Sequence, residues 1–144
     1  MKKLFLLLAV SAIALTSCSK DDDSSSSNGG KLIMTIDNVT KTFNNIVVVE
    51  EEIEGVTSIY VTATVGNSTS DIVYLELEKN VIGEDAISNF EYKKNNVTYS
   101  YDSMINNVTV ASGNKLKGSF SGQIVDEDYT DYLTISSGSF DISY

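Results

Sequence analysis

Apolar and polar side chains alternate over residues 59–65 and 73–77, and this alternation restricts the possible folds more than any other feature of the chain. Side chains of a β-strand point in turn to the two faces of a sheet, so each segment predicts a strand with one apolar face. The two apolar faces coincide if Ala63 opposes Val73 and Val61 opposes Leu75. The sequence therefore predicts a hairpin whose loop covers residues 66–70.

The same signal continues through the chain from residue 31 onwards. Val, Ile, Thr, Tyr and Ser dominate, and Gly or Asn interrupts them roughly every ten residues, a spacing typical of all-β domains. We predict one domain over residues 31–144, an antiparallel β-sandwich or flattened barrel of about 8–10 short strands. The alternation does not distinguish these two architectures. The best helix candidate, residues 83–88, is long enough for about one turn.

Aromatic residues gather in the next predicted hairpin. Two asparagines at 95 and 96 suit a two-residue turn, because Asn tolerates the positive φ that such a turn needs. Tyr92 then opposes Tyr99, and Phe90 opposes Tyr101. This register predicts four rings on one face of the sheet.

A third hairpin depends on the length of its loop. Val108 and Val110 share a face with Leu116 and Phe120 only if residues 112–114 form a three-residue loop. We therefore expect a loop of that length.

The last predicted strands contain a short repeated motif, GSFSG at 118–122 and GSFD at 138–141. The glycines on either side of Phe120 leave room for a neighbouring ring to lie over the backbone. Phe140 is out of phase with the apolar residues that precede it, so one residue must be absorbed at 136–138. A β-bulge is the simplest device for this.

The first 17 residues are typical of an export signal: two lysines are followed by a short apolar run. The order Leu15-Thr16-Ser17-Cys18 then resembles the lipobox of bacterial lipoproteins, with Ser at −1 where Gly or Ala is more usual. The resemblance implies cleavage before Cys18 and attachment of palmitate-type acyl chains to it. Several chains together hold a protein firmly on a membrane. The alternative is an ordinary cleaved signal peptide with an incidental cysteine.

Residues 18–30 predict a solvated tether, because Asp, Ser and Gly dominate and few apolar groups are available to bury. The run Asp21, Asp22 and Asp23 beside the predicted lipid resembles the export tag of surface-exposed lipoproteins. That resemblance implies an outer-membrane protein facing the cell exterior, with a periplasm-facing anchor as the alternative.

The closing stretch, KLKGSFSGQI…LTISSGSFDISY at 115–144, resembles the end of small, uncharacterised all-β lipoproteins of the bacterial envelope. A short TIDN…F hairpin at 35–43 resembles their opening. The resemblance implies a β fold and no catalytic residues.

Composition excludes several classes of function. The formal charge is −10 and the chain contains no His; the printed sequence also has no Arg. Nucleic acid is therefore not expected as a partner, because the phosphate backbone would be repelled. Without His, and with Cys18 consumed by acylation, nucleophilic triads and His- or Cys-based metal sites are not available. We expect no cofactor and no enzymatic activity.

Two groups of carboxylates were considered for chemistry. Glu76 and Glu78 are candidates for glycosidase chemistry, but they fall on the expected outer face of a strand. Asp126, Asp128 and Asp131 crowd one predicted loop and are weak candidates for Ca²⁺. The simpler interpretation is a solvated hairpin tip, and we predict no metal site.

Eight tyrosines without any Trp suggest a ligand surface instead. The candidates are Tyr92, Tyr99 and Tyr101 of the aromatic hairpin, with Tyr60 and Tyr74 on an outer face. Ser103 lies in an Asp-Ser-Met sequence that resembles an O-glycosylation site. We expect a lipid-anchored binding module for a glycan or an envelope protein; the alternatives are a structural accessory lipoprotein and, more distantly, a glycoside-active enzyme.

Overall fold

The computed structural model describes residues 29–144, so the predicted signal peptide, Cys18 and the export-tag aspartates lie outside the described residues. The described part is all-β, as predicted, with ten strands and no helix. The strands are β1 (Gly29–Ile36), β2 (Val39–Phe43), β3 (Asn45–Ile53), β4 (Val56–Thr64), β5 (Asp71–Glu78), β6 (Gly83–Glu84), β7 (Ile87–Lys94), β8 (Val97–Ser112), β9 (Lys115–Asp126) and β10 (Tyr132–Ser143). None of the described residues forms a helix long and apolar enough to cross a bilayer.

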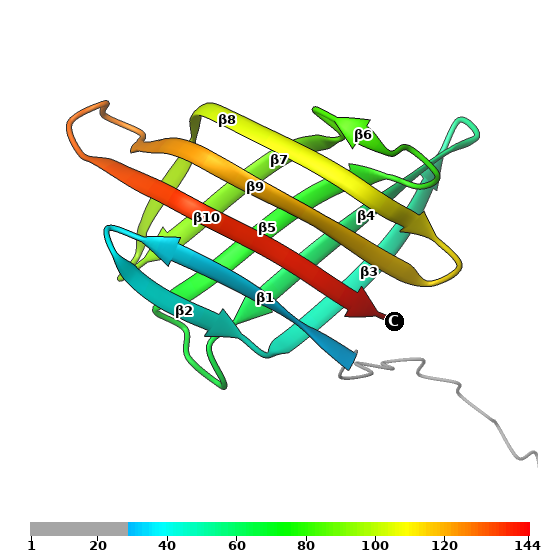
Figure 1. Cartoon of the computed structure of the whole chain (residues 1–144), viewed down its shortest axis with the longest axis horizontal. Helices are drawn as coiled ribbons and strands as arrows, with labels where there is room; N and C mark the ends of the chain where they lie inside the picture. Colours follow the sequence, from blue (N-terminus) through cyan, green and yellow to red (C-terminus); the bar gives the residue numbers. More distant parts are fainter. Residues whose placement is uncertain (1–28) are drawn as a thin grey trace, which may run out of the picture.

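The strands form one antiparallel sheet in the order β2-β1-β10-β9-β8-β7-β5-β4-β3, with the short β6 paired to β8. The sheet curls into a half-barrel. Figure 1 shows its two facing layers: β2, β1, β10, β9 and most of β8 form one, and β7, β5, β4 and β3 form the other, with the strands of the two layers crossing. The observed architecture therefore combines features of the predicted sandwich and the predicted flattened barrel.

The 16-residue strand β8 connects the two layers. Its first residues pair with β7, and it pairs with β9 along its length. Its register against β9 shifts twice, once between Tyr101 and Ser103 and once between Val108 and Val110. Such bulges bend a strand and increase its twist, so they account for the turn of β8 from one layer to the other.

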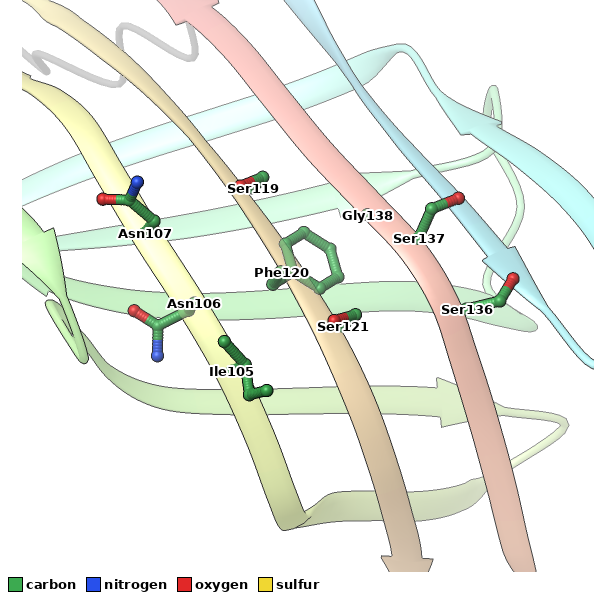
Figure 2. Close-up of a pocket in the computed structure, with 9 residues that line it drawn as sticks. All are labelled: Ile105, Asn106, Asn107, Ser119, Phe120, Ser121, Ser136, Ser137 and Gly138. Atoms are coloured by element: carbon green, nitrogen blue, oxygen red, sulfur yellow. The ribbon is translucent and has the colours of Figure 1, made fainter.

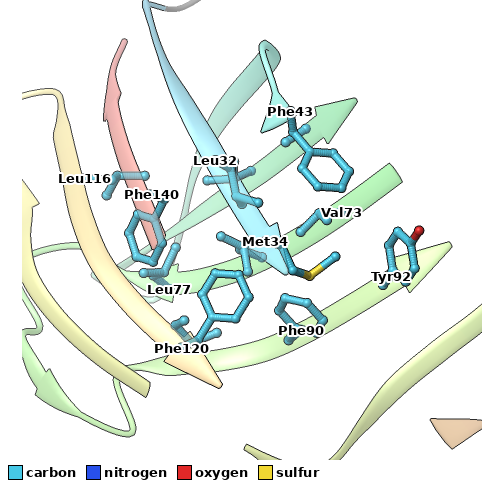
Figure 3. Close-up of a cluster of buried hydrophobic side chains, with 14 of the residues drawn as sticks. Leu32, Met34, Phe43, Val73, Leu77, Phe90, Tyr92, Leu116, Phe120 and Phe140 are labelled. Atoms are coloured by element: carbon cyan, nitrogen blue, oxygen red, sulfur yellow. The ribbon is translucent and has the colours of Figure 1, made fainter. Parts of the chain in front are cut away.

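The predicted register is confirmed in the hairpin of β4 and β5, where Ala63 pairs with Val73 and Val61 with Leu75. The inward side chains of both layers meet in one core, part of which is drawn in Figure 3. The largest fully buried side chains include Tyr92, Phe43, Phe90, Phe140 and Leu32. The rings of Phe90 and Phe120 lie 5.1 Å apart and connect β7 with β9 across the interior.

The two similar motifs, GSFSG in β9 and GSFD in β10, lie side by side. In each motif a phenylalanine ring packs on a glycine of the other motif. Phe140 pairs with Gly118 and Phe120 with Gly138, and each ring lies over the glycine opposite. The register shift between Ile135 and Gly138 confirms the predicted bulge. The glycines thus make space for two large core rings on adjacent strands.

Three local predictions are wrong. Residues 83–88 form no helix: Gly83 and Glu84 pair with β8 as the short β6. The loop after β8 has two residues rather than three, since Ser112 pairs with Lys115, and a bulge near Val108 absorbs the extra residue. The sheet also begins before residue 31, because Gly29 and Gly30 pair with the end of β10.

Two polar clusters connect the layers. At one end of the half-barrel, Lys41 of β2 lies 2.5 Å from the carboxylate of Asp71 on β5, and the hydroxyl of Tyr92 on β7 donates to the same oxygen. Burial alone would raise the pKa of Asp71, but these two hydrogen bonds outweigh it and lower that pKa. At the other end, Glu50 of β3 accepts 2.6 Å hydrogen bonds from Lys79 and from the hydroxyl of Tyr144.

Candidate ligand-binding site between β7 and β8

The candidate site lies where β7 and β8 separate. The two strands pair over residues 91–94 and 97–100, and the ladder ends at the pair of Glu91 and Ser100. Beyond that pair, β8 turns towards the other layer and β6 pairs with it farther along. A bulge lies on each side of the separation, at Ser88 in β7 and at Asp102 in β8. Bulges next to a gap in a sheet are common at functional sites.

A pocket of about 310 Å³ occupies this separation. Its lining is about half polar, which is a larger polar share than most small-molecule sites have. The lining residues are Asp85, Ile87, Ser88, Tyr101, Met104 and Asn106.

Asn106 is the most informative of these residues, because only 5% of it is exposed. Its Oδ1 accepts a 3.0 Å hydrogen bond from the backbone N–H of Ile87, which fixes the orientation of the side-chain amide. Within residues 29–144, no acceptor bonds to its Nδ2. Every fully enclosed side-chain nitrogen or oxygen in this part of the chain has a partner, so this Nδ2 is not fully enclosed. Asn106 lines the pocket, and its amide keeps two N–H donors that no residue of the described chain uses.

The other polar groups of the pocket come from the connection before β7 and from the start of β7. Asp85 is exposed, has a φ of 59° and donates its backbone N–H to the carbonyl of Asn106 at 3.3 Å. It is the one acidic residue among those that line the pocket. The hydroxyl of Ser88 donates to the carbonyl of Glu76 at 3.0 Å and still has lone pairs that accept hydrogen bonds.

Two further hollows adjoin the pocket along β8. One, of about 480 Å³, is lined by residues 101–105 with Ser121 and Gly122. The other, of about 240 Å³, lies over β8, β9 and β10, and Figure 2 shows Ile105, Ser121 and Ser137 around it. Ile105 is 75% exposed between these two hollows. At the bend of β8, the exposed side chain of Ile105 is thus bordered by hydroxyl groups.

The predicted aromatic ladder is only half correct. Tyr92 opposes Tyr99, and both side chains are buried, so neither is a ligand surface. Phe90 does not oppose Tyr101: β7 and β8 have separated by that point, and Tyr101 pairs with Ile124 on β9 instead. Tyr101 is consequently 51% exposed and borders the pocket.

The second pair of tyrosine candidates lies on the outer face of β4 and β5, as predicted. Tyr60 is half-buried there, and Tyr74 is 37% exposed. They do not adjoin the pocket between β7 and β8. Glu76 pairs with Tyr60, and Glu78 is exposed at the end of β5.

Two of the three carboxylates proposed as weak Ca²⁺ candidates, Asp126 and Asp131, already accept hydrogen bonds from the protein. Asp126 accepts hydrogen bonds from both backbone and side chain of Thr130 and from the backbone of Asp131. Asp131 accepts a 2.7 Å hydrogen bond from Tyr99, and this bond, together with burial, raises the pKa of Tyr99 to about 12. Asp128 is exposed. Between residues 29 and 144, no three acidic side chains are grouped in a way that could hold a metal ion.

Ser103 is exposed, as an O-glycosylation site requires, but it lies in β8 at the bend rather than on a loop. Sequence reasoning missed Asn106 and Asp85. The signal for Asn106 was available: it is an amide at an inward position of a strand, between Met104 and Val108, where an apolar residue is expected. Asp85 gave no comparable signal.

Comparison with known proteins adds no relative. No family model matches the chain, and neither a curated protein nor a solved structure is significantly similar to it. A function can therefore be proposed only from the residues of the chain itself.

Proposed function

We propose that the chain is a lipid-anchored lipoprotein of the outer membrane, displayed at the cell surface, whose β domain is a non-enzymatic binding module. The anchor and the location are supported by the Leu15–Cys18 lipobox pattern and by the acidic run at residues 21–23. The binding role is supported by the bend of β8. We infer that the ligand is a glycan.

The observation that carries the proposal is the grouping of hollows around one exposed strand segment. Tyr101 and Met104 border both the pocket and the neighbouring hollow, and Ile105 borders the two outer hollows. Exposed apolar side chains beside hydroxyl and amide groups are typical of a surface that binds an amphipathic ligand. Sugar rings are amphipathic in this sense, since they present both C–H faces and hydroxyl groups.

A glycoside-active enzyme is less well supported. Hydrolysis of a glycosidic bond requires two carboxyl groups on either side of the bond. Asp85 is the one carboxylate that lines the pocket, and Asp102 is the one that lines the adjacent hollow. A glycosidic bond held inside the pocket itself would therefore meet one acid rather than two, which favours recognition over hydrolysis there.

The alternative is an accessory lipoprotein that docks on an envelope protein. It is favoured by the outer face of β3, where Val47 is 38% and Val49 is 54% exposed. These residues pair with Thr62 and Tyr60 of β4, so an apolar and aromatic patch covers this layer. Such a patch fits a protein partner better than a sugar.

The anchor and the display are tested by protease accessibility on intact cells. We expect the native protein to be cut, and the variant with Asp21, Asp22 and Asp23 changed to Ala to be protected. Cys18→Ala should release the protein from membranes. Protection of both the native protein and the triple variant would overturn surface display.

The binding role is tested by screening the full mature chain on a glycan array. Tyr101→Ser should abolish the signal. Tyr132→Ser is the matched control, because Tyr132 is a similarly exposed tyrosine, at 46%, that does not border the hollows of the β8 bend. A negative array together with capture of an envelope protein through the β3 face would favour the accessory alternative.

A further inference from the structure

We infer that the pocket between β7 and β8 holds one neutral, hydroxyl-bearing ring of the monosaccharide class, with the amide of Asn106 as donor and the carboxylate of Asp85 as acceptor. This inference rests on the proposed binding function and adds to it the subsite and the class of the bound unit.

The size of the pocket limits the bound unit. Its volume of about 310 Å³ lies at the lower end of the range for small-molecule sites, which starts at about 300 Å³. One small ring fits this space, whereas a longer chain must continue outside it. The hollow along residues 101–105 lies beside the pocket, since Tyr101 and Met104 border both. It can accept a neighbouring unit of a longer glycan.

The polar groups specify a ligand that both donates and accepts. Asn106 presents two N–H donors from a nearly buried side chain whose oxygen is already bonded to Ile87. Asp85 presents acceptors only. A hydroxyl group satisfies either kind of partner because it has one donor and two lone pairs. An ammonium group would pair with Asp85 but could accept nothing from Asn106.

Charge disfavours an acidic ligand. The formal net charge of the chain is −10, and Asp85 and Asp102 lie at the pocket and at the hollow beside it. An anionic sugar would meet repulsion both at a distance and in contact. A neutral sugar does not.

The apolar part of the lining suits the face of a ring. Tyr101 is 51% exposed and Met104 is half-buried, and Ile87 completes the apolar wall. An aromatic ring offers a flat apolar body with a polar tip, which matches a sugar ring with C–H groups on one face. Stacking on Tyr101 would therefore add to the hydrogen bonds with Asn106 and Asp85.

The test is a titration of the full mature chain in detergent micelles. Binding is monitored through the side-chain amide signal of Asn106 in ¹H–¹⁵N NMR spectra. The probes are the methyl glycosides of glucose, galactose, mannose and N-acetylglucosamine, with methyl glucuronide as the acidic counterpart. We expect at least one neutral glycoside to shift the Asn106 signal. The glucuronide should bind with an affinity at least tenfold lower.

Two variants identify the pocket as the cause. Asn106→Asp keeps an oxygen for the N–H of Ile87 but removes both donors. Asp85→Asn removes the negative charge and replaces one of the two acceptor oxygens by a donor, while Asn tolerates the positive φ at that position. Each should weaken neutral-glycoside binding at least tenfold. Asn45→Asp is the matched control, since Asn45 is exposed at the start of β3 and lines neither this pocket nor the hollows beside it; it should bind as the native chain does.

Three other outcomes would overturn the inference. If Tyr101→Ser abolishes binding while Asn106→Asp and Asp85→Asn leave it unchanged, the surface binds glycans without the pocket, and the proposed function stands. If the glucuronide binds more tightly than every neutral glycoside, the assigned class is wrong. If no glycoside binds, the subsite is wrong, and the glycan array then decides separately whether the proposed binding function also fails.

Discussion

The ring of Phe140 on β10 lies directly over the backbone of Gly118 on β9, and the space between them would not admit a methyl group. A Cβ at Gly118 would stand 2.5 Å from Cζ of that ring and 2.8 Å from the carbonyl oxygen of Asn107. The ring thus occupies the volume that any other residue at 118 would need. Phe120 lies in the same way over Gly138.

Gly118→Ala should therefore destabilise the domain. The new methyl group meets backbone on one side, so the ring must move, and overpacking of this kind costs about 1–3 kcal/mol. The measurement is the midpoint of urea unfolding. Gly29→Ala is the control, because nothing lies within 4 Å of a Cβ at Gly29. Equal midpoints for the two variants would contradict the close packing of ring and glycine.

Tyr92→Phe should weaken the cluster that connects β2 to β5 and β7. The change removes a hydrogen bond to the carboxylate of Asp71, and a bond to a charged group contributes about 1.5–3 kcal/mol. Urea unfolding at neutral pH measures the loss. It should shrink in acid as Asp71 becomes protonated. Tyr74→Phe, on the outer face, serves as the control and should leave the midpoint unchanged; a loss that is equally large at every pH would argue against the role of the Asp71 charge.

The pH dependence of stability should be flat around neutrality and fall at both extremes. The chain has no His to titrate between pH 5 and 8. The hydrogen bond from Lys79, followed by that from Tyr144, lowers the pKa of Glu50, so the stability that this group adds is present above its unfolded pKa and is lost as pH falls through the lower folded value. Asp71, whose pKa is also lowered, acts in the same direction.

At the alkaline extreme the sign reverses. The pKa of Tyr99 is raised to about 12 from an ordinary value of 10.0, so the folded state keeps a proton that the unfolded state loses. Its contribution is complete below pH 10 and disappears as pH rises towards 12. Thermal unfolding followed by circular dichroism across the pH range tests both limbs. Tyr99→Phe should flatten the alkaline limb, and a marked transition near pH 6.5 would contradict the whole profile.

Asn106→Ala should cost stability independently of any ligand. It leaves the N–H of Ile87, a residue that is 6% exposed, without its acceptor, and an unsatisfied buried donor costs about 1–3 kcal/mol. Asn107→Ala provides the comparison on the same strand. Thermal unfolding of the two variants should differ by several degrees; identical midpoints would mean that water entering the pocket replaces the lost oxygen.

Much of the fold could be predicted because local alternation fixes which side of a strand is buried. The pairing of Ala63 with Val73 followed from that rule alone, since both strands are regular and their loop is short. The bulge before Gly138 was also predictable, because Phe140 and Ile135 are out of phase in the sequence itself. In these places, residues that are close in the sequence are enough to predict the register.

The bend of β8 could not be predicted in this way. Its two register shifts depend on how β8 lies against β9 and β7 together, and neither strand alone records that arrangement. The predicted pairing of Tyr101 with Phe90 is wrong for this reason, because the ladder of β7 and β8 ends one residue earlier. The pocket exists because β7 and β8 separate, so it was hidden for the same reason.

The position of β8 in the sheet also sets the direction from which a ligand arrives. Ser112 pairs with Lys115, Lys115 with Ser143 and Ser143 with Gly29, so one end of β8 lies in the same row as the point where the preceding chain enters the domain. Tyr101 lies near the opposite end of β8, about 30 Å from that row if each residue adds the usual rise of a β-strand. Figure 1 shows the start of β1 and the bend of β8 at opposite corners of the molecule. If the proposed lipid anchor holds the start of β1 close to a membrane, a ligand of the proposed binding module would reach the pocket from the side that faces away from that membrane.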